Sequence, residues 1–398
     1  MRHPRVLITL LGCAQIVSWG ALYYAFSLFV LPMQVEFGWS LTAVNGALSC
    51  GLLVAGLCAY PVGTLIDRHG GRIIMGCGAL AGALLLLAWS SIDSLPALYL
   101  VWIGLGVAMA AVLYEPLFIV LAQHFGDDAR RAITALTLIA GFASTVFMPL
   151  VETLLASLDW RAVLRVLAAC MLAVSLPINA LCVPRRGAHR HSPSTGAEVA
   201  AERAAARAAL AGYLRTRLFA GLALWFTAWA GTASAVMFQL VPYLKHAGVD
   251  HATLLLTVAL VGPSQVAGRL LLMLGGERLG TTQVGALVTT LLPLALLVLT
   301  LAPPTAAWLA LFAVLFGCAN GVTTILRGVV PAEWLGRVHL GRVMGALGTP
   351  MMVAMAVAPS ASAALWVASD SPRVMQLGVF ALALSGSVGF WLAVTARR

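Results

Sequence analysis

A succession of long apolar runs governs what this chain of 398 residues can fold into. The first run starts at Val6 and ends near Pro32, which is too long for the core of a cleaved signal peptide. Each run reaches about 20 residues, the length that an α-helix needs to cross a hydrocarbon layer of about 30 Å. The other runs lie at 41–63, 72–92, 97–122, 131–155, 161–183, 217–244, 252–274, 281–301, 305–327, 340–366 and 374–395. We therefore predict an all-α integral membrane protein with twelve transmembrane helices.

The charged residues agree with this class. Only 10% of the residues are charged and 61% are hydrophobic, whereas a soluble domain carries roughly a quarter charged residues. The net charge of +10 resides in short loops, which is the positive-inside pattern of membrane proteins and argues against nucleic acid as a partner. The side opposite the termini has little more than Arg161, Lys245 and Arg373. We expect a multi-pass protein of a bacterial-type inner (plasma) membrane with both termini in the cytoplasm.

A glycine-rich charged turn, Gly63–Arg72, recurs in the second half of the chain. When Asp67 is aligned with Glu277, the arginine and the glycine that follow each acid also align. This echo predicts two pseudo-symmetric six-helix bundles, at residues 1–183 and 217–398.

Between the two bundles, residues 184–216 form the main polar segment, which we expect to be a cytoplasmic linker. Thr195 and Glu198 have the spacing of a capping box. The alanine-rich run behind them, with Arg203 and Arg207, predicts a short amphipathic helix against anionic lipid headgroups. A plain tether is the alternative.

The charged turn carries the pattern G-x-L-x-D-R-x-G-x-R, formed here by Gly63, Leu65, Asp67, Arg68, Gly70 and Arg72. With the twelve runs and the echo at Glu277 and Arg278, the whole chain resembles the major facilitator superfamily. The resemblance implies a secondary transporter whose halves give alternating access to a midplane site. The turn would be a cytoplasmic gate motif, because its glycines allow a tight turn and the Asp67 carboxylate favours the positive N-terminus of a neighbouring helix. A loop whose charges only fix orientation is the alternative.

Ionisable residues inside the apolar runs are functional candidates, because each costs about 2.5–3.5 kcal/mol to insert into a membrane. Arg269 lies about 12 Å from the inner turn, near the midplane, at 1.5 Å per residue. Gln265 precedes it by one helical turn on the same face. A guanidinium there can bind a carboxylate through two parallel hydrogen bonds. The structural alternative is a bond to Glu115 or to a backbone carbonyl.

The spacing from Gly268 and Arg269 to Glu277 and Arg278 is similar to that of the monocarboxylate and oxalate–formate branch of the superfamily. The segment F-G-W-S at residues 37–40 fits the same branch. The resemblance implies that Arg269 binds the carboxylate of a substrate. Two features depart from the branch's animal members, since the first run has no lysine and residues 251–268 contain no acid.

Glu115 is the only acid deep in an apolar run. Removal from water favours the neutral form of a carboxyl group, so Glu115 is a candidate proton carrier. When Gly106 is aligned with Gly317, Glu115 falls one place from the counterpart of Arg327. The two are therefore candidates for an inner gate, with a static ion pair or an interfacial Arg327 as the alternatives.

Polar and aromatic residues recur at helical spacing in the runs that line the cavity of the resembled family. We predict a substrate-binding site formed by Gln15, Trp19, Tyr23, Tyr114, Trp225, Trp229, Gln265, Arg269 and Asn320. These residues suit a substrate with an apolar or aromatic body and a carboxylate head. Ordinary packing and membrane-interface positions are the alternative.

These features predict a symporter that couples protons to the transport of a small, monocarboxylate-like organic anion. The alternative is proton-coupled efflux of hydrophobic or cationic drugs, although residues 141–149 lack the G-x-x-x-G-P repeat of many drug/proton antiporters. The chain has no P-loop, catalytic motif or C-x-x-C pair. We expect no enzyme activity, cofactor or metal, and a monomer that interacts with its substrate, protons and the lipid bilayer.

Overall fold

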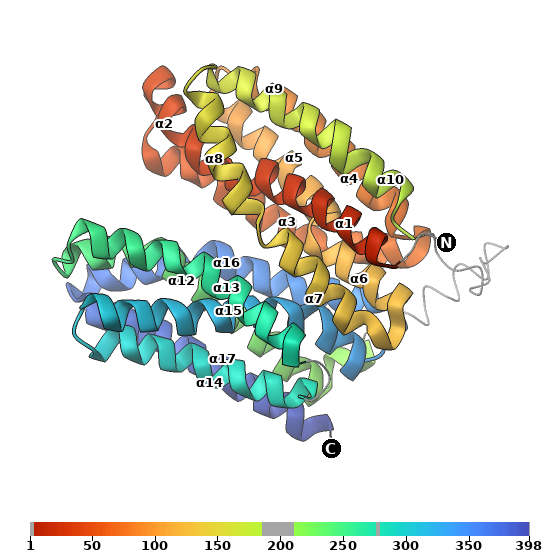
Figure 1. Cartoon of the computed structure of the whole chain (residues 1–398), viewed down its shortest axis with the longest axis vertical. Coiled ribbons are helices and arrows are strands. Elements are labelled where there is room, and N and C mark those ends of the chain that lie inside the picture. The colour runs from red at the N-terminus through yellow and green to blue at the C-terminus, as the bar shows by residue number, and fades with distance from the viewer. Residues whose placement is uncertain (1–3, 185–210, 276–278, 398) are drawn as a thin grey trace. The chain divides into compact units, whose positions relative to one another are not determined.

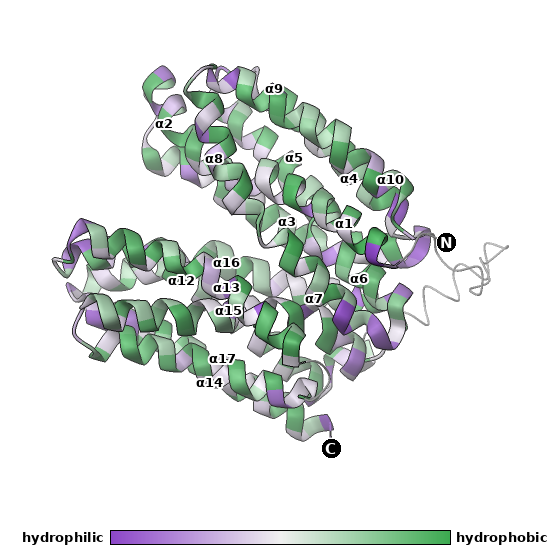
Figure 2. Ribbon diagram, in the orientation of Figure 1, coloured by the Kyte–Doolittle hydropathy of each residue, from purple (hydrophilic) through white to green (hydrophobic). Residues whose placement is uncertain are grey.

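The computed structural model describes residues 4–184, 211–275 and 279–397, and in these ranges the chain forms helices joined by turns (Figure 1). Eleven helical segments in these ranges are long and apolar enough to cross a membrane, and polar residues gather near their ends (Figure 2). The longest segment, Leu95–Leu155, has 61 residues. It contains two predicted spans, because the chain reverses at Gly126–Asp128, where Gly126 has φ 57°. The predicted all-α membrane fold is confirmed.

The chain divides into two compact units. Unit 1 comprises Met1–Ser192 and Arg337–Thr349, and unit 2 comprises Pro193–Gly336 and Pro350–Arg398. The second boundary falls inside one helix, α16 (Leu340–Ser369), so that residues 340–349 pack with unit 1. The two units therefore share a helix.

Most of the predicted linker at 184–216 lies outside the described residues. Its capping box at Thr195 and Glu198, and the basic pair Arg203 and Arg207, belong to that part of the chain. The amphipathic helix stays a prediction.

The spans of unit 1 are interrupted more often than predicted. Its elements are α1 (Pro4–Trp19), η1 (Gly20–Tyr24), α2 (Phe26–Phe37), α3 (Leu41–His69), α4 (Gly71–Trp89), α5 (Leu95–Val112), α6 (Tyr114–Phe125), η2 (Gly126–Asp128), α7 (Ala129–Ala140), α8 (Ala143–Leu155), α9 (Trp160–Cys170), η3 (Met171–Ser175) and α10 (Leu176–Leu181). The first and sixth spans contain the π turns η1 and η3, and the fourth breaks at Leu113. Such interruptions often mark functional sites.

Unit 2 is built from continuous helices. They are α12 (Arg217–His246), α13 (His251–Gly275), α14 (Thr281–Leu301), α15 (Ala306–Trp334), the part of α16 from Pro350 onward, and α17 (Pro372–Arg397). Within the unit, α13 packs on α15, α12 packs on α17, and α14 packs on both α15 and α17. Asp250 caps α13 by accepting the Thr253 N–H at 3.0 Å, and this bond lowers the pKa of Asp250.

At three of the prolines in the described helices, a side chain bonds the backbone carbonyl that has lost its usual donor. Proline has no N–H to bond the carbonyl four residues earlier, and in a membrane a neighbouring side chain has to replace that donor. Here a neighbouring helix supplies an amide or a hydroxyl each time. Gln15 Nε2 donates to Val112 O at 2.8 Å, four residues before Pro116. Ser387 Oγ donates to Thr289 O at 2.6 Å, four residues before Pro293. Ser234 Oγ donates to Met355 O at 2.7 Å, four residues before Pro359.

The internal repeat is visible in the packing of each unit. In unit 1, a Cβ atom on Gly106 of α5 would meet the carbonyl oxygen of Gly51 on α3. In unit 2, a Cβ atom on Gly317 of α15 would lie 2.7 Å from the carbonyl oxygen of Val261 on α13. The alignment of the two charged turns also pairs Gly51 with Val261, so equivalent positions make equivalent contacts. Small residues at such positions let membrane helices approach closely.

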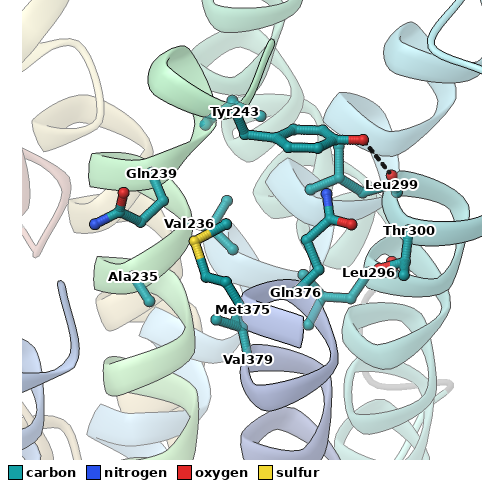
Figure 3. A pocket seen from close by; sticks show the side chains of 11 residues that line it. Ala235, Val236, Gln239, Tyr243, Leu296, Leu299, Thr300, Met375, Gln376 and Val379 are labelled. Atoms are coloured by element: carbon teal, nitrogen blue, oxygen red, sulfur yellow. Dashed lines mark hydrogen bonds between the residues drawn. The ribbon is translucent and has the colours of Figure 1, made fainter. Parts of the chain in front are cut away.

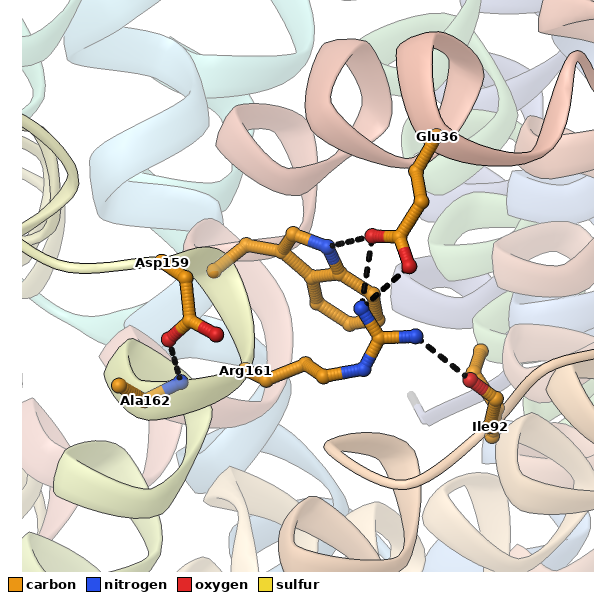
Figure 4. Close-up of polar contacts among 6 residues, drawn as sticks. Glu36, Ile92, Asp159, Arg161 and Ala162 are labelled. Carbon is orange, nitrogen blue, oxygen red and sulfur yellow. Dashed lines mark hydrogen bonds and ion pairs between the residues drawn. The ribbon is translucent and has the colours of Figure 1, made fainter.

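One end of unit 1 is tied together by Glu36, near the end of α2. Its carboxylate accepts the indole N–H of Trp160 at 2.6 Å and the guanidinium of Arg161 at 2.5 and 2.7 Å (Figure 4). Arg161 also donates to Ile92 O at 3.1 Å. The first and sixth spans are therefore fixed to the loop after the third.

Residues 37–40 form the turn between α2 and α3. Gly38 ends α2 in the left-handed region, at φ 69°, where glycine is favoured. Ser40 begins α3 by accepting the Ala43 N–H at 3.2 Å. The residue types in this segment thus have a structural explanation.

Candidate functional site

Arg269 of α13 is buried against α15. Its side chain is only 5% exposed, and its Nε donates to the carbonyl of Gly321 at 3.3 Å. The helices meet this closely because a Cβ atom on Gly268 would lie 2.8 Å from the Cα of Cys318, and one on Gly321 would meet the carbonyl of Gln265. The backbone of Gln265 therefore belongs to the same helix contact as Arg269, and its role in substrate binding stays a prediction.

Arg327 of α15 is the second buried arginine of unit 2. It is 8% exposed, so its side chain is buried within the protein. Its guanidinium carbon lies 5.8 Å from the ring centroid of Trp229, within range of a cation–π interaction. Its Nη1 lies 3.5 Å from the sulfur of Met351. Arg327 and Trp229, a residue predicted to bind the substrate, thus lie close together.

Trp225 is packed among aromatic rings, whereas Asn320 has a polar atom available for a ligand. Trp225 is 2% exposed and packs on Phe226 and Phe390. Together with Trp229 it lines a small hollow within unit 2. Asn320 is half-buried, and its side-chain oxygen has no hydrogen-bond partner among the described residues. Asn320 is therefore the more available polar group of the two.

An aromatic cluster forms where the first span of unit 1 changes to a π turn. The Trp19 ring lies 5.5 Å from Tyr23 and 5.0 Å from Tyr114, so the structure brings these three predicted residues together. The indole N–H of Trp19 has no partner among the described residues. Gln15, in contrast, is fully buried and its amide N–H is committed to Val112. Only its oxygen is left for a ligand.

Glu115 lies in the first turn of α6, directly after the break at Leu113. The break places the N-terminus of α6 inside a membrane-spanning segment, and a helix N-terminus favours a carboxylate. Glu115 is half-buried there. It belongs to unit 1 and Arg327 to unit 2, so their pairing stays a prediction.

The second candidate functional site is the charged turn Gly63–Arg72, which contains Asp67. It is 6% exposed, and its two carboxylate oxygens accept the backbone N–H groups of Gly341 at 3.0 Å and Arg342 at 3.1 Å. Gln123 adds a third hydrogen bond at 3.2 Å. Asp67 thus caps the N-terminus of α16, the kind of partner that the sequence predicts for it.

The other residues of the turn have definite structural tasks. A Cβ atom on Gly63 would meet the carbonyl oxygen of Gly341, so only glycine allows this approach. Gly70 ends α3 at φ 82°, and Arg72 Nε donates to Val183 O at 2.7 Å. Arg68 is half-buried. The second-half counterparts Glu277 and Arg278 lie outside the described residues.

The sequence prediction omits the partners on α16, although a pattern for them exists. Gly341, Gly345 and Gly348 are spaced four and three residues apart, which is a small-residue stripe typical of close packing in membranes. A Cβ atom on Gly345 would lie 2.6 Å from the carbonyl oxygen of Ala59 on α3. The stripe therefore marks the face of α16 that packs on α3.

Comparison with known proteins adds independent information. The sequence pattern of the Major Facilitator Superfamily matches residues 11–359. Among solved structures, the transporter FucP in an outward conformation has a TM-score of 0.75 at 13% identity, covering 99% of each chain. The proton:xylose symporter XylE, bound to 6-bromo-6-deoxy-D-glucose, gives 0.74 at 15% identity, covering 98% of this chain and 95% of its own. The human organic anion transporter MFSD10 gives 0.71 at 14% identity, covering 99% and 100%. No curated protein matches by sequence.

Proposed function

Because this chain belongs to the Major Facilitator Superfamily, we propose that it couples protons to the transport of a small, monocarboxylate-like organic anion. Members of the family are transporters that bind small molecules and are not enzymes, which confirms that part of the prediction. The substrate, the proton and the cytoplasmic location of both termini are the proposal. The chain would work as a monomer by alternating access.

The observation that carries the anion assignment is the burial of two arginines in unit 2. Arg269 and Arg327 are 5% and 8% exposed in otherwise apolar helices. A membrane segment with two deep positive charges favours an anionic ligand, and guanidinium groups suit carboxylates.

Two further residues of unit 1 have roles in this proposal. Glu115, at the start of a broken helix, would carry the proton, because a carboxyl group can take up and release a proton. Asp67 would hold the N-terminus of α16 in one state of the cycle and release it in the other. Its three hydrogen bonds support such a latch.

The test measures substrate-driven proton flux in proteoliposomes with an internal pH dye. We expect an inward gradient of a small or aromatic monocarboxylate to acidify the lumen. Arg269→Lys and Arg327→Lys should each raise the KM for the carboxylate about tenfold or more, since lysine cannot form the bidentate contact. Arg373→Lys, at an exposed position at the start of α17, is the matched control. Unchanged carboxylate transport in both buried variants would overturn the anion site.

Efflux of lipophilic cations is the second candidate function. It is favoured by the aromatic cluster of Trp19, Tyr23 and Tyr114 beside Glu115, because aromatic faces and a carboxylate attract cations. In the same vesicles, proton flux that responds to lipophilic cations alone, and that Glu115→Gln abolishes, would replace the anion assignment by this one.

A further inference from the structure

The break in the fourth span lies directly before the residue that we propose as the proton carrier. Helix α5 ends at Val112, Leu113 has an extended backbone with φ −79° and ψ −154°, and α6 begins at Tyr114. Glu115 is therefore in the first turn of α6. The geometry of the break at Leu113 consequently decides where the carboxyl group of Glu115 lies.

A side chain of another helix bonds the last carbonyl before this break. The Val112 carbonyl has no backbone donor four residues later, because residue 116 is a proline. Gln15 of α1 replaces that donor with its Nε2, at 2.8 Å from the Val112 oxygen. Since Gln15 is fully buried, bulk water cannot take over this bond. The end of α5 is thus fixed by α1.

The same helix, α1, also contacts the start of α6. Trp19 follows Gln15 by four residues, which places the two side chains on one face of α1. The Trp19 ring lies 5.0 Å from the ring of Tyr114. Gln15 and Trp19 therefore contact the residues on either side of Leu113, and together they hold both arms of the break.

A bond of the same kind in unit 2 shows what is particular to Gln15. The Tyr243 hydroxyl donates at 3.4 Å to the carbonyl of Leu299, four residues before Pro303 (Figure 3). That carbonyl belongs to the last turn of α14, which is followed by a loop, so the bond satisfies an ordinary helix end. After Val112, in contrast, a new helix begins two residues later, within the same membrane-spanning segment.

We propose that Gln15 is a positioning residue for Glu115. By bonding the Val112 carbonyl it fixes the break, and the break holds the Glu115 carboxyl group at the N-terminus of α6. A helix N-terminus stabilises the ionised form of a carboxyl group, so this geometry influences how readily Glu115 takes up a proton. The inference rests on the proposed role of Glu115 as the proton carrier.

The test follows the protonation of Glu115 directly and needs no substrate. The full-length protein in phosphatidylcholine vesicles is titrated with acid while infrared difference spectra are recorded. The carboxyl C=O band that disappears in Glu115→Gln is assigned to Glu115. In Gln15→Met, which keeps the volume of the side chain but has no N–H, the midpoint of this band should move to higher pH by about 0.5 unit, because the carboxylate loses part of its stabilisation by the helix N-terminus.

Two control variants each remove one comparable hydrogen bond elsewhere. Ser18→Ala removes the bond to Ser175 at 2.7 Å, which is fully buried and lies on the same helix as Gln15. Tyr243→Phe removes the corresponding bond of unit 2. Both should leave the midpoint of the Glu115 band unchanged, since neither touches the break. Should Gln15→Met fail to fold, Gln15→Asn, which keeps an amide on a shorter side chain, gives the same readout.

The outcomes separate this inference from the proposed function. A Glu115 band with the same midpoint in the wild type and in Gln15→Met would overturn the positioning role alone. An equal shift in Gln15→Met and Ser18→Ala would also overturn it, because the shift would then reflect general destabilisation. If no band depends on Glu115, this residue does not carry the proton, and the proposed coupling fails together with the inference.

Discussion

At the scale of single residues, Asp67 has the most clearly defined environment. Its carboxylate accepts the N–H groups of Gly341 and Arg342, where hydrogen bonding and the helix dipole act together. Asp67→Asn removes the charge while keeping a side chain of similar shape. We expect a cost of about 1–2 kcal/mol for holding this end of α16.

Amide hydrogen exchange in residues 337–349 measures this directly, because the protected N–H groups are the ones that Asp67 binds. Exchange there should accelerate about 5- to 30-fold when it follows the opening equilibrium. Asp127→Asn is the control: Asp127 pairs with Arg337 at 2.8 Å in the same unit but is fully exposed, and such pairs contribute little. Equal acceleration in both variants would show that the hydrogen bonds of Asp67 do not stabilise the N-terminus of α16.

At the scale of elements, the prolines and their side-chain donors predict an energetic coupling between helices. Ser234→Ala should cost about 0.5–1.5 kcal/mol, because it leaves the Met355 carbonyl without a donor. In a Pro359→Ala background the same change should cost less than about 0.5 kcal/mol, since an alanine at that position has the N–H that restores the backbone bond.

A double-mutant cycle in detergent unfolding measures this coupling. Ser385→Ala is a suitable control, because Ser385 Oγ donates within its own helix, to Leu382 O at 2.7 Å. An equal cost for Ser234→Ala in both backgrounds would contradict the pairing of Ser234 with the proline site.

The elements also show where prediction from sequence stops. The twelve spans follow from the lengths of the apolar runs alone, and the cap by Asp67 follows from the charge of a helix N-terminus. The π turn at Gly20–Tyr24 lies inside an apolar run whose hydropathy does not mark it. The break at Leu113 lies beside Glu115 and Pro116, which do not by themselves fix its position. The role of Gln15 depends on a carbonyl 97 residues away, so no local pattern contains it.

At the scale of the whole molecule, the repeat predicts that both units respond alike to the same substitution. Gly106→Ala and Gly317→Ala each introduce a Cβ atom against a carbonyl oxygen of the neighbouring helix. We expect each to lower the free energy of unfolding by about 1–3 kcal/mol, as overpacking does. Gly262→Ala is the control on α13, because nothing lies within 4 Å of its Cβ position. It should be neutral or stabilise by up to about 1 kcal/mol, and a comparable loss in all three would refute the close contacts.

Because α16 belongs partly to each unit, a single cut in the gene cannot separate the two units completely. A cut within residues 185–210 would yield two polypeptides of similar length, yet the amino-terminal one would lack Arg337–Thr349, which belong to its own contact unit. Its Asp67 would face no helix terminus, and the glycine stripe of α16 would be missing from α3. Such fragments should accumulate only when they are co-expressed, because neither fragment contains one whole unit with nothing missing or left over.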